Sequence, residues 1–251
     1  MTNLTRRTFL GAGAALAATV NPGLVPGRAA AARNWDMPAA YSGSNFISMS
    51  YAAFADAVRE KTSGEINITV HPGGSLYDGS EILRAVREGQ VPIGARFLAA
   101  HSSEMPLLGV DTIPFPATDK EAAWKLYRAS KPAIEATLAQ RGLVLLYAPV
   151  WPPQGLFSKK AIASVADMKG VKFRAYDPST TRLAELMGAV PTKTEASEIA
   201  QAFSTGIAEA MIASGAIGVF QKMWDFVDHF YRSTRGCRRA ASSSTPMPST
   251  N

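Results

Sequence analysis

The sequence GVKFRAYDPSTTRL (residues 170–183) contains the pattern that most directly predicts the fold. Apolar and polar side chains alternate over residues 171–176, which is typical of a β-strand with one buried face. Asp-Pro at 177–178 ends the strand, and a helix is expected from residue 179 onward. Arg174 therefore lies two residues before the carboxyl end of a strand, the edge at which open α/β sheets bind ligands.

Two kinds of partner are open to Arg174 at this edge. The amino end of the next helix offers free N–H groups and a positive dipole end, and a guanidinium beside them can hold a carboxylate through two parallel hydrogen bonds. This arrangement favours a small bound acid. The alternative is an ion pair with a nearby carboxylate of the protein, such as Asp177 or Glu195. The spacing alone does not separate the two interpretations.

Short strands alternate with longer helices on both sides of this segment. The expected strands are 34–41, 65–70, 91–97, 143–150, 155–160, 171–176, 189–194 and 207–213. The expected helices are 46–61, 80–88, 118–142, 179–187, 195–204 and 217–230. The strand-helix-strand order at 65–97 predicts parallel pairing of its two strands. The whole pattern predicts an α/β fold of two lobes, 33–145 and 146–231, joined by segments that cross between them at 142–160.

The two ends of the chain differ from this patterned body. Residues 1–32 combine an Arg-Arg pair, a short apolar run and a run of small residues, which is typical of a twin-arginine export signal cleaved between Ala31 and Arg33. Residues 232–251 contain four arginines, eight Ser or Thr and almost no large apolar side chain, so we expect a disordered tail that is foreign to the fold. A functional basic tail is the alternative.

The net charge of +6 arises from these ends. Residues 1–32 contribute three arginines and residues 232–251 contribute four, with no acidic side chain in either segment, so the body between them has a net charge of −1. A nearly neutral body gives no electrostatic attraction to nucleic acid or to an anionic membrane surface. Neither is expected as a partner.

The sequence contains no motif for catalysis or metal binding. Cys237 is the single cysteine, so no internal disulfide is expected. His71, His101 and His229 are scattered and lack the spacing of a zinc site. We therefore expect a protein that has no cofactor and is not an enzyme. A secreted α/β enzyme acting on small acids is the alternative, because acidic side chains distant in sequence can converge in space.

Several pieces of the sequence, in order, resemble the solute-binding proteins of TRAP (tripartite ATP-independent periplasmic) transporters. The pieces that resemble the signature region of that family are DMKGVKFR (167–174), LMGAVP (186–191) and STGIAEAM (204–211). The pieces that resemble its first domain are FADAVREKTSGEINITVHPGGSL (54–76) and EILRAVREGQVPIG (81–94). The resemblance covers residues 35–231, which is the whole patterned body.

This resemblance implies a two-lobed flytrap in the periplasm that closes over a small organic acid and delivers it to the membrane permease of a TRAP transporter. It also implies a monomer. In most members of the family, the arginine at the position of Arg174 holds the ligand carboxylate. The other walls of the cleft are expected from segments that follow the strands, with the residues Tyr41, Asn45, Phe97, Trp151, Gln154, Tyr176 and Ser214. Hinge packing is the alternative for Trp151, and core packing is the alternative for Phe97.

Two features depart from the family pattern. Glu209 stands in a turn where the family has an aspartate, and IASGA (212–216) stands where many members have polar side chains that contact the ligand, so the identity of the acid is open. The tail at 232–251 stands where the family continues with a further strand and long helices. We therefore expect a truncated or frameshifted carboxyl-terminal part and low stability, with a non-functional fragment as the alternative to a transport protein.

Overall fold

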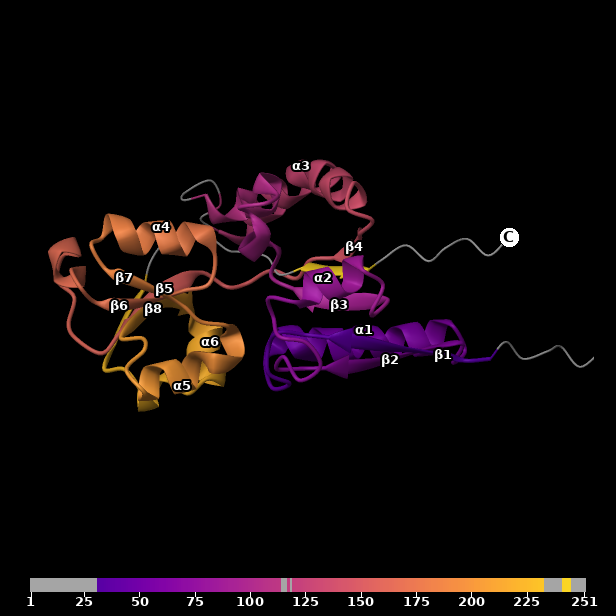
Figure 1. Cartoon of the computed structure of the whole chain (residues 1–251), viewed down its shortest axis with the longest axis horizontal. Helices are drawn as coiled ribbons and strands as arrows, with labels where there is room; N and C mark the ends of the chain where they lie inside the picture. The colour runs from indigo at the N-terminus through magenta and orange to yellow at the C-terminus, as the bar shows by residue number, and fades with distance from the viewer. Residues whose placement is uncertain (1–30, 114–116, 118, 233–240, 245–251) are drawn as a thin grey trace, which may run out of the picture. The chain divides into compact units, whose positions relative to one another are not determined.

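The computed structural model describes residues 31–113, 117, 119–232 and 241–244 (Figure 1). The predicted twin-arginine signal and Cys237 lie outside these residues, apart from the last two positions of the signal. Within the described part, no helix combines the length and the apolar character needed to cross a membrane. By its contacts, the chain from Ala32 onward forms one compact unit, so the boundary between two lobes near residue 145 stays a prediction.

The described chain begins with a strand-helix-strand unit. Its elements are β1 (Arg33–Pro38), α1 (Phe46–Lys61) and β2 (Ile66–His71), and β1 pairs with β2 in parallel. The helix has the predicted bounds, because its apolar stripe is buried and its first turn is capped. The cap is Asn45, whose side-chain oxygen accepts a hydrogen bond from the Ile47 N–H at 2.9 Å.

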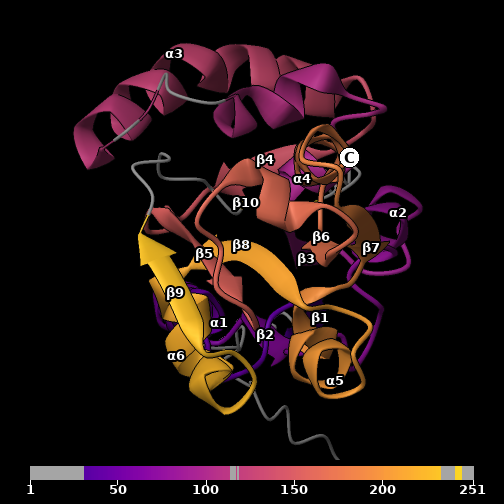
Figure 2. The same ribbon diagram turned by 90° about the vertical axis from the view of Figure 1, so that its left-hand side faces the viewer.

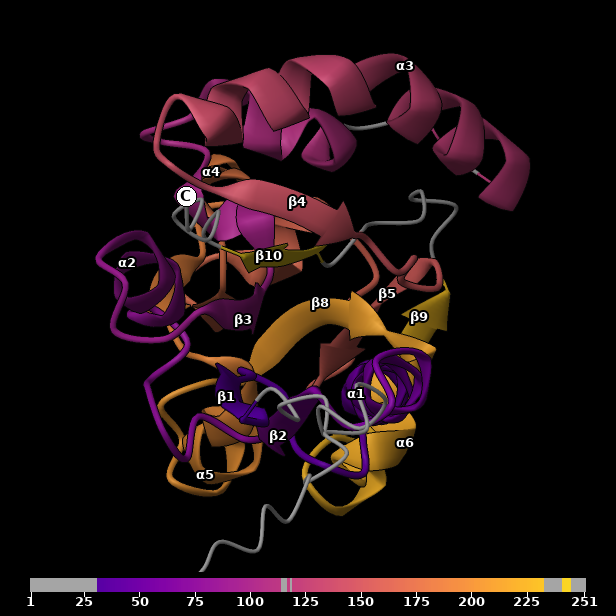
Figure 3. The same ribbon diagram turned by 90° about the vertical axis from the view of Figure 1, so that its right-hand side faces the viewer.

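A second sheet has three strands in the order β3-β10-β4 (Figure 3). Its strands are β3 (Ile93–Arg96), β4 (Val144–Tyr147) and β10 (Ala241–Ser244), and β10 is antiparallel to both neighbours. The parallel pairing predicted between 65–70 and 91–97 is not observed. Instead β2 pairs with β1, and the segment after β1 approaches β3 through a parallel bridge between Ala39 and Ala95.

Strand β10 corrects the expectation that residues 232–251 are disordered throughout. Its backbone is paired on both sides, although its sequence ASSS contains no large apolar residue. The ladder forms between N–H and C=O groups, so composition alone did not predict it. Strands β3 and β4 each gain a partner for an edge that would otherwise be open. Residues 233–240 and 245–251 lie outside the described residues, and Arg232 belongs to β9.

Helices and 3-10 turns connect the strands of this first part. They are α2 (Ile82–Arg87), η1 (Leu98–His101), η2 (Pro106–Thr112) and α3 (Lys120–Ala139). The side chain of Asp119 caps α3 by accepting a hydrogen bond from the Ala122 N–H at 2.8 Å. The helix therefore begins two residues after the start of the range 118–142 expected from the sequence.

The second part is a five-stranded sheet in the order β7-β6-β8-β5-β9. Its strands are β5 (Gln154–Ser158), β6 (Lys172–Ala175), β7 (Val190–Lys193), β8 (Ala210–Ser214) and β9 (His229–Arg232). Strand β6 is parallel to β7 and β8, whereas β5 is antiparallel to β8 and β9.

Helices cover both faces of this sheet, with α4 over one face and α5 and α6 over the other (Figures 1 and 2). The α-helices are α4 (Pro178–Leu186), α5 (Ile199–Ser204) and α6 (Gly215–Phe220). The 3-10 helices are η3 (Val165–Met168), η4 (Ala196–Glu198) and η5 (Met223–Asp225). This arrangement confirms the α/β class predicted from the alternating pattern.

The single helix predicted over 217–230 is wrong, because α6, η5 and β9 occupy that stretch. Lys222 has a left-handed backbone with a φ of 48°, which interrupts the helical hydrogen-bond ladder. Phe230 then packs on Phe157 of the neighbouring strand, with ring centroids 4.5 Å apart. The apolar residues in this stretch have helix-like spacing, but they belong to a short helix, a 3-10 turn and an edge strand.

One buried apolar cluster contains residues from both parts of the chain. Tyr51 of α1 and Ile93 of β3 belong to it, as do Phe203 of α5 and Met211 of β8, and each is fully buried. Burying such large side chains is the main favourable term in folding. The cluster therefore holds the first part of the chain against the five-stranded sheet.

Candidate functional site

A pocket of about 550 Å³, part of it open to solvent, lies at the carboxyl end of β6. The first predicted lobe contributes Ala40, Tyr41, Arg96 and Phe97 to the lining. The second contributes Trp151, Gln154, Arg174, Tyr176, Glu195, Ala196, Ile199, Ala213, Ser214 and Ile217.

Arg174 enters this pocket from β6 and is 5% exposed. Its Nε donates a hydrogen bond of 3.0 Å to the carbonyl oxygen of Thr194, and its Cζ lies 4.6 Å from the centroid of the Tyr176 ring. Burial lowers the pKa of Arg174, but an arginine stays charged in proteins. A buried cation needs a compensating anion.

The carboxylates that could have neutralised Arg174 have other partners. Asp177 caps α4, where its Oδ1 accepts hydrogen bonds from the N–H and the hydroxyl of Thr180, both at 2.7 Å. Glu195 forms an ion pair with Arg96. Among the described residues, no ion pair includes Arg174, and its two terminal nitrogens donate no hydrogen bond to another side chain or carbonyl. The pocket thus contains a guanidinium whose terminal nitrogens can take a ligand.

A second arginine lines the pocket, and it is paired. Arg96 Nη1 lies 2.8 Å from Glu195 Oε2, and Arg96 Nη2 lies 3.1 Å from Glu195 Oε1. The two side chains are 6% and 15% exposed. Two parallel bonds between a planar guanidinium and a carboxylate form the strongest common type of ion pair.

Aromatic rings form much of the remaining wall. Trp151 contacts the rings of Tyr41 and Phe46, each with centroids 5.0 Å apart. Phe97 packs edge-on against Tyr176 at 5.9 Å. Burial raises the pKa of Tyr41 well above its usual range, so this hydroxyl is a neutral donor. Such walls offer apolar contact to the body of a small ligand.

Several of the lining residues also carry polar side-chain atoms. The indole Nε1 of Trp151 is buried and has no hydrogen-bond partner among the described residues. The Tyr176 hydroxyl donates to Gln154 Oε1 at 3.3 Å, and Ser214 Oγ accepts from the Ile217 N–H at 3.3 Å. Because an unpaired buried donor costs free energy, Trp151 Nε1 is suited to an acceptor on a ligand.

The structure brings together seven of the eight residues predicted for the site. They are Tyr41, Phe97, Trp151, Gln154, Arg174, Tyr176 and Ser214. Asn45 does not line the pocket, because its side chain points to the N–H of Ile47 at the start of α1. Sequence reasoning considered Glu195 only as a partner of Arg174, and it missed Ala40, Arg96, Ala196, Ile199, Ala213 and Ile217.

A signal for Arg96 was present in the sequence. Arg96 is the last residue of an otherwise apolar strand, and Arg174 is the second-last residue of its own strand. The carboxyl end of a strand is where a charged side chain can reach a ligand. No comparable signal marks Ile199 or Ile217, because the sequence pattern predicts that apolar residues on a helix pack in the core. In the part of the chain that the structure describes, no group of three or more His, Cys, Asp or Glu side chains could hold a metal ion.

Comparison with protein families gives one match over most of the chain. Residues 41–237 match the family model of the bacterial extracellular solute-binding proteins, family 7. A curated relative, a solute-binding protein of Albidiferax ferrireducens, is 26% identical over 164 residues, which cover 64% of this chain and 48% of the relative. The chain thus spans about half the length of this relative.

Comparison with solved structures gives matches that share both sequence and fold. A TRAP solute-binding protein from a marine metagenome, specific for pyroglutamate, has 45% identity and a TM-score of 0.84 over 86% of this chain and 71% of its own. An extracytoplasmic solute receptor of Bordetella pertussis that binds pyroglutamic acid has 39% identity and a TM-score of 0.82 over 85% and 71%. These matches confirm the predicted periplasmic-binding-protein fold.

Proposed function

This chain belongs to the bacterial extracellular solute-binding proteins, family 7, which include the solute-binding proteins of TRAP transporters, and we propose that it captures a small monocarboxylate for such a transporter. The observation that carries the proposal is Arg174. It is a buried guanidinium that lines the pocket and takes part in no ion pair among the described residues. A ligand carboxylate would supply the missing negative charge.

The ligand that fits the lining best is a cyclic monocarboxylate of the size of pyroglutamate. Pyroglutamate carries one carboxylate on a five-membered lactam ring. Its carboxylate suits Arg174, and its apolar ring edge suits the aromatic walls. Its ring carbonyl is an acceptor for the unpaired Nε1 of Trp151. Two relatives with 45% and 39% identity bind this acid, which supports the assignment.

Each group has a distinct part in the proposed capture. Arg174 fixes the orientation of the acid through two charge-assisted hydrogen bonds, and its own bond to Thr194 keeps the guanidinium plane in place. The rings of Tyr41 and Trp151 exclude water from the ring of the ligand. The two predicted lobes, 33–145 and 146–231, would close over the ligand about the segments at 142–160.

The proposed transport role also implies where the protein acts and which partner receives the ligand. We propose export to the periplasm by the twin-arginine signal, action as a monomer, and release of the acid to a membrane permease. Family membership supports the extracytoplasmic location and the permease partner. The chain covers only part of the length of its relatives, so the location, the monomeric state and the permease partner are proposals.

Calorimetric titration of the purified protein with pyroglutamate and with its neutral carboxamide tests the proposal. Both compounds have the same ring and nearly the same shape, but only the acid carries a charge for Arg174. We expect stoichiometric binding of the acid without product formation, and at least about tenfold weaker binding of the amide. Equal binding of both compounds would refute the carboxylate site. Turnover of the acid would favour a secreted enzyme instead.

A further inference from the structure

Among the described residues, three charged side chains line the pocket, and their charges do not cancel. Arg174 and Arg96 are cations and Glu195 is an anion, so the lining has a net charge of +1. Glu195 is bound to Arg96 through both of its oxygens, at 2.8 and 3.1 Å. Within the described lining, Arg174 is therefore the charged side chain that takes part in no ion pair.

Two further ionisable groups, His101 and Asp177, lie near the pocket but do not line it. Burial lowers the pKa of His101 to about 4, so this imidazole is neutral at physiological pH. Asp177 is buried near Arg174 but does not line the pocket, and its Oδ1 is bound to the N–H and the hydroxyl of Thr180.

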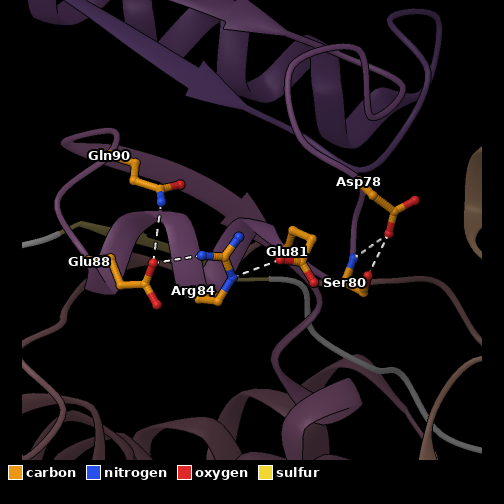
Figure 4. Close-up of polar contacts among 6 residues, drawn as sticks. All are labelled: Asp78, Ser80, Glu81, Arg84, Glu88 and Gln90. Carbon is orange, nitrogen blue, oxygen red and sulfur yellow. Dashed lines mark hydrogen bonds and ion pairs between the residues drawn. The ribbon is translucent and has the colours of Figure 1, made fainter.

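The fold holds the Arg96–Glu195 pair tightly in place. A Cβ on Gly79 would lie 2.7 Å from Arg96 Nη1 and 2.7 Å from Glu195 Oε2, so the chain passes directly over the pair. The turn around Gly79 is fixed by Asp78, whose Oδ1 accepts hydrogen bonds from the N–H and the hydroxyl of Ser80 at 2.8 and 2.7 Å (Figure 4).

On the other side of the pair, the Glu195 N–H donates to Glu198 Oε2 at 3.0 Å. The backbone of Glu195 is thus anchored independently of its side chain.

From this geometry we infer that Glu195 is a specificity-determining residue, which restricts the pocket to acids with one negative charge. This inference rests on the proposed function. A second carboxylate on a ligand would need Arg96, whose two terminal nitrogens are already bound to Glu195. If the ligand displaced Glu195, a buried carboxylate would remain unpaired; if it did not, two anions would lie side by side. Both outcomes are unfavourable in a site of low dielectric.

Two acids with one skeleton and different charge provide the test. Glutarate is a dianion at neutral pH, whereas its monoamide, glutaramate, is a monoanion, and both have the same number of non-hydrogen atoms as pyroglutamate. Binding of both is measured by calorimetry in the purified parent protein and in Glu195→Gln, which keeps the shape of the side chain and removes its charge. We expect the parent to prefer glutaramate, and the affinity ratio of glutarate to glutaramate to rise at least about tenfold in Glu195→Gln.

Two further variants separate charge from structural disturbance. Glu185→Gln removes a negative charge from the exposed surface of α4, where Glu185 pairs with Arg182, and should keep the parent ratio. The double variant Arg96→Gln/Glu195→Gln replaces the ion pair by two neutral side chains, so it also should keep a preference for the monoanion. If Glu195→Gln fails to fold, this double variant carries the test, because a gain in glutarate binding there would overturn the inference.

The possible results distinguish this inference from the function on which it rests. If pyroglutamate binds and the ratio is the same in the parent and in Glu195→Gln, the charge restriction is wrong while the carboxylate site stands. If no monocarboxylate binds to the parent, the proposed function and the inference both fail. A parent protein that binds pyroglutamate but already prefers glutarate to glutaramate would overturn the inference alone.

Discussion

Arg174 Nε donates a hydrogen bond to the carbonyl oxygen of Thr194 at 3.0 Å, and this bond orients the guanidinium in the pocket. The donor comes from β6 and the acceptor follows β7, its parallel neighbour. The pairing of β6 with β7 therefore orients the Arg174 side chain, which lines a pocket with several aromatic walls. A site that is arranged before the ligand arrives loses little entropy on binding.

The Trp151 indole provides a first prediction. Trp151→Phe keeps an aromatic wall but removes the N–H that has no partner among the described residues. We expect pyroglutamate to bind more weakly by about 1 kcal/mol, or roughly fivefold, which is the usual contribution of a neutral hydrogen bond. Cyclopentanecarboxylate, which has no ring carbonyl, should bind equally to the parent and to the variant in the same calorimetric experiment. An equal loss for both acids would show that Trp151 acts by packing alone.

Gly79 provides a prediction on stability. A methyl group at Gly79 would lie 2.7 Å from both members of the Arg96–Glu195 pair and 3.2 Å from Cβ of Ala40, so Gly79→Ala should displace the pair and destabilise the protein by about 1–3 kcal/mol. Gly215→Ala is the matched control, because Gly215 begins α6 with no atom within 4 Å of an added Cβ. Thermal unfolding should show a lower Tm for Gly79→Ala and an unchanged or higher Tm for Gly215→Ala. Equal values would contradict the tight packing over the pair.

These predictions rest partly on features that sequence reasoning reached and partly on features that it missed. The bounds of α1 and the strand-to-helix step at Arg174 followed from periodicity and local turn chemistry, which depend on neighbours in the sequence. The Arg96–Glu195 pair joins positions 99 residues apart, so no local pattern could reveal it. Strand β10 was missed for the same reason, since its partners β3 and β4 are distant in sequence.

The partly buried His101 makes stability depend on pH. Its pKa is lowered from about 6.5 to about 4 by burial and then by the positive charge of Arg96. In the unfolded chain the imidazole is protonated below about pH 6.5, whereas in the folded protein it stays neutral down to about pH 4. The unfolded state therefore binds more protons in this interval, and the free energy of unfolding falls as the pH is lowered from about 6.5 to about 4.

The variant His101→Gln isolates this contribution from that of the acidic residues. We expect its free energy of unfolding to decline less than that of the parent over the same interval, by on the order of 2–3 kcal/mol. Urea denaturation at several pH values measures the difference between the two proteins. Parallel declines in both proteins would contradict a neutral imidazole at His101 in the folded state.

The most direct test of the central claim is the affinity of pyroglutamate for Arg174→Gln, measured by calorimetry. Arg182→Gln is the matched control, because Arg182 is an exposed arginine on α4 that pairs with Glu185. If Arg174 holds the ligand carboxylate, the first variant loses about 2–5 kcal/mol of binding free energy, which is well over tenfold in Kd, and the control binds as the parent does. An unchanged Kd in a folded Arg174→Gln protein would contradict the account.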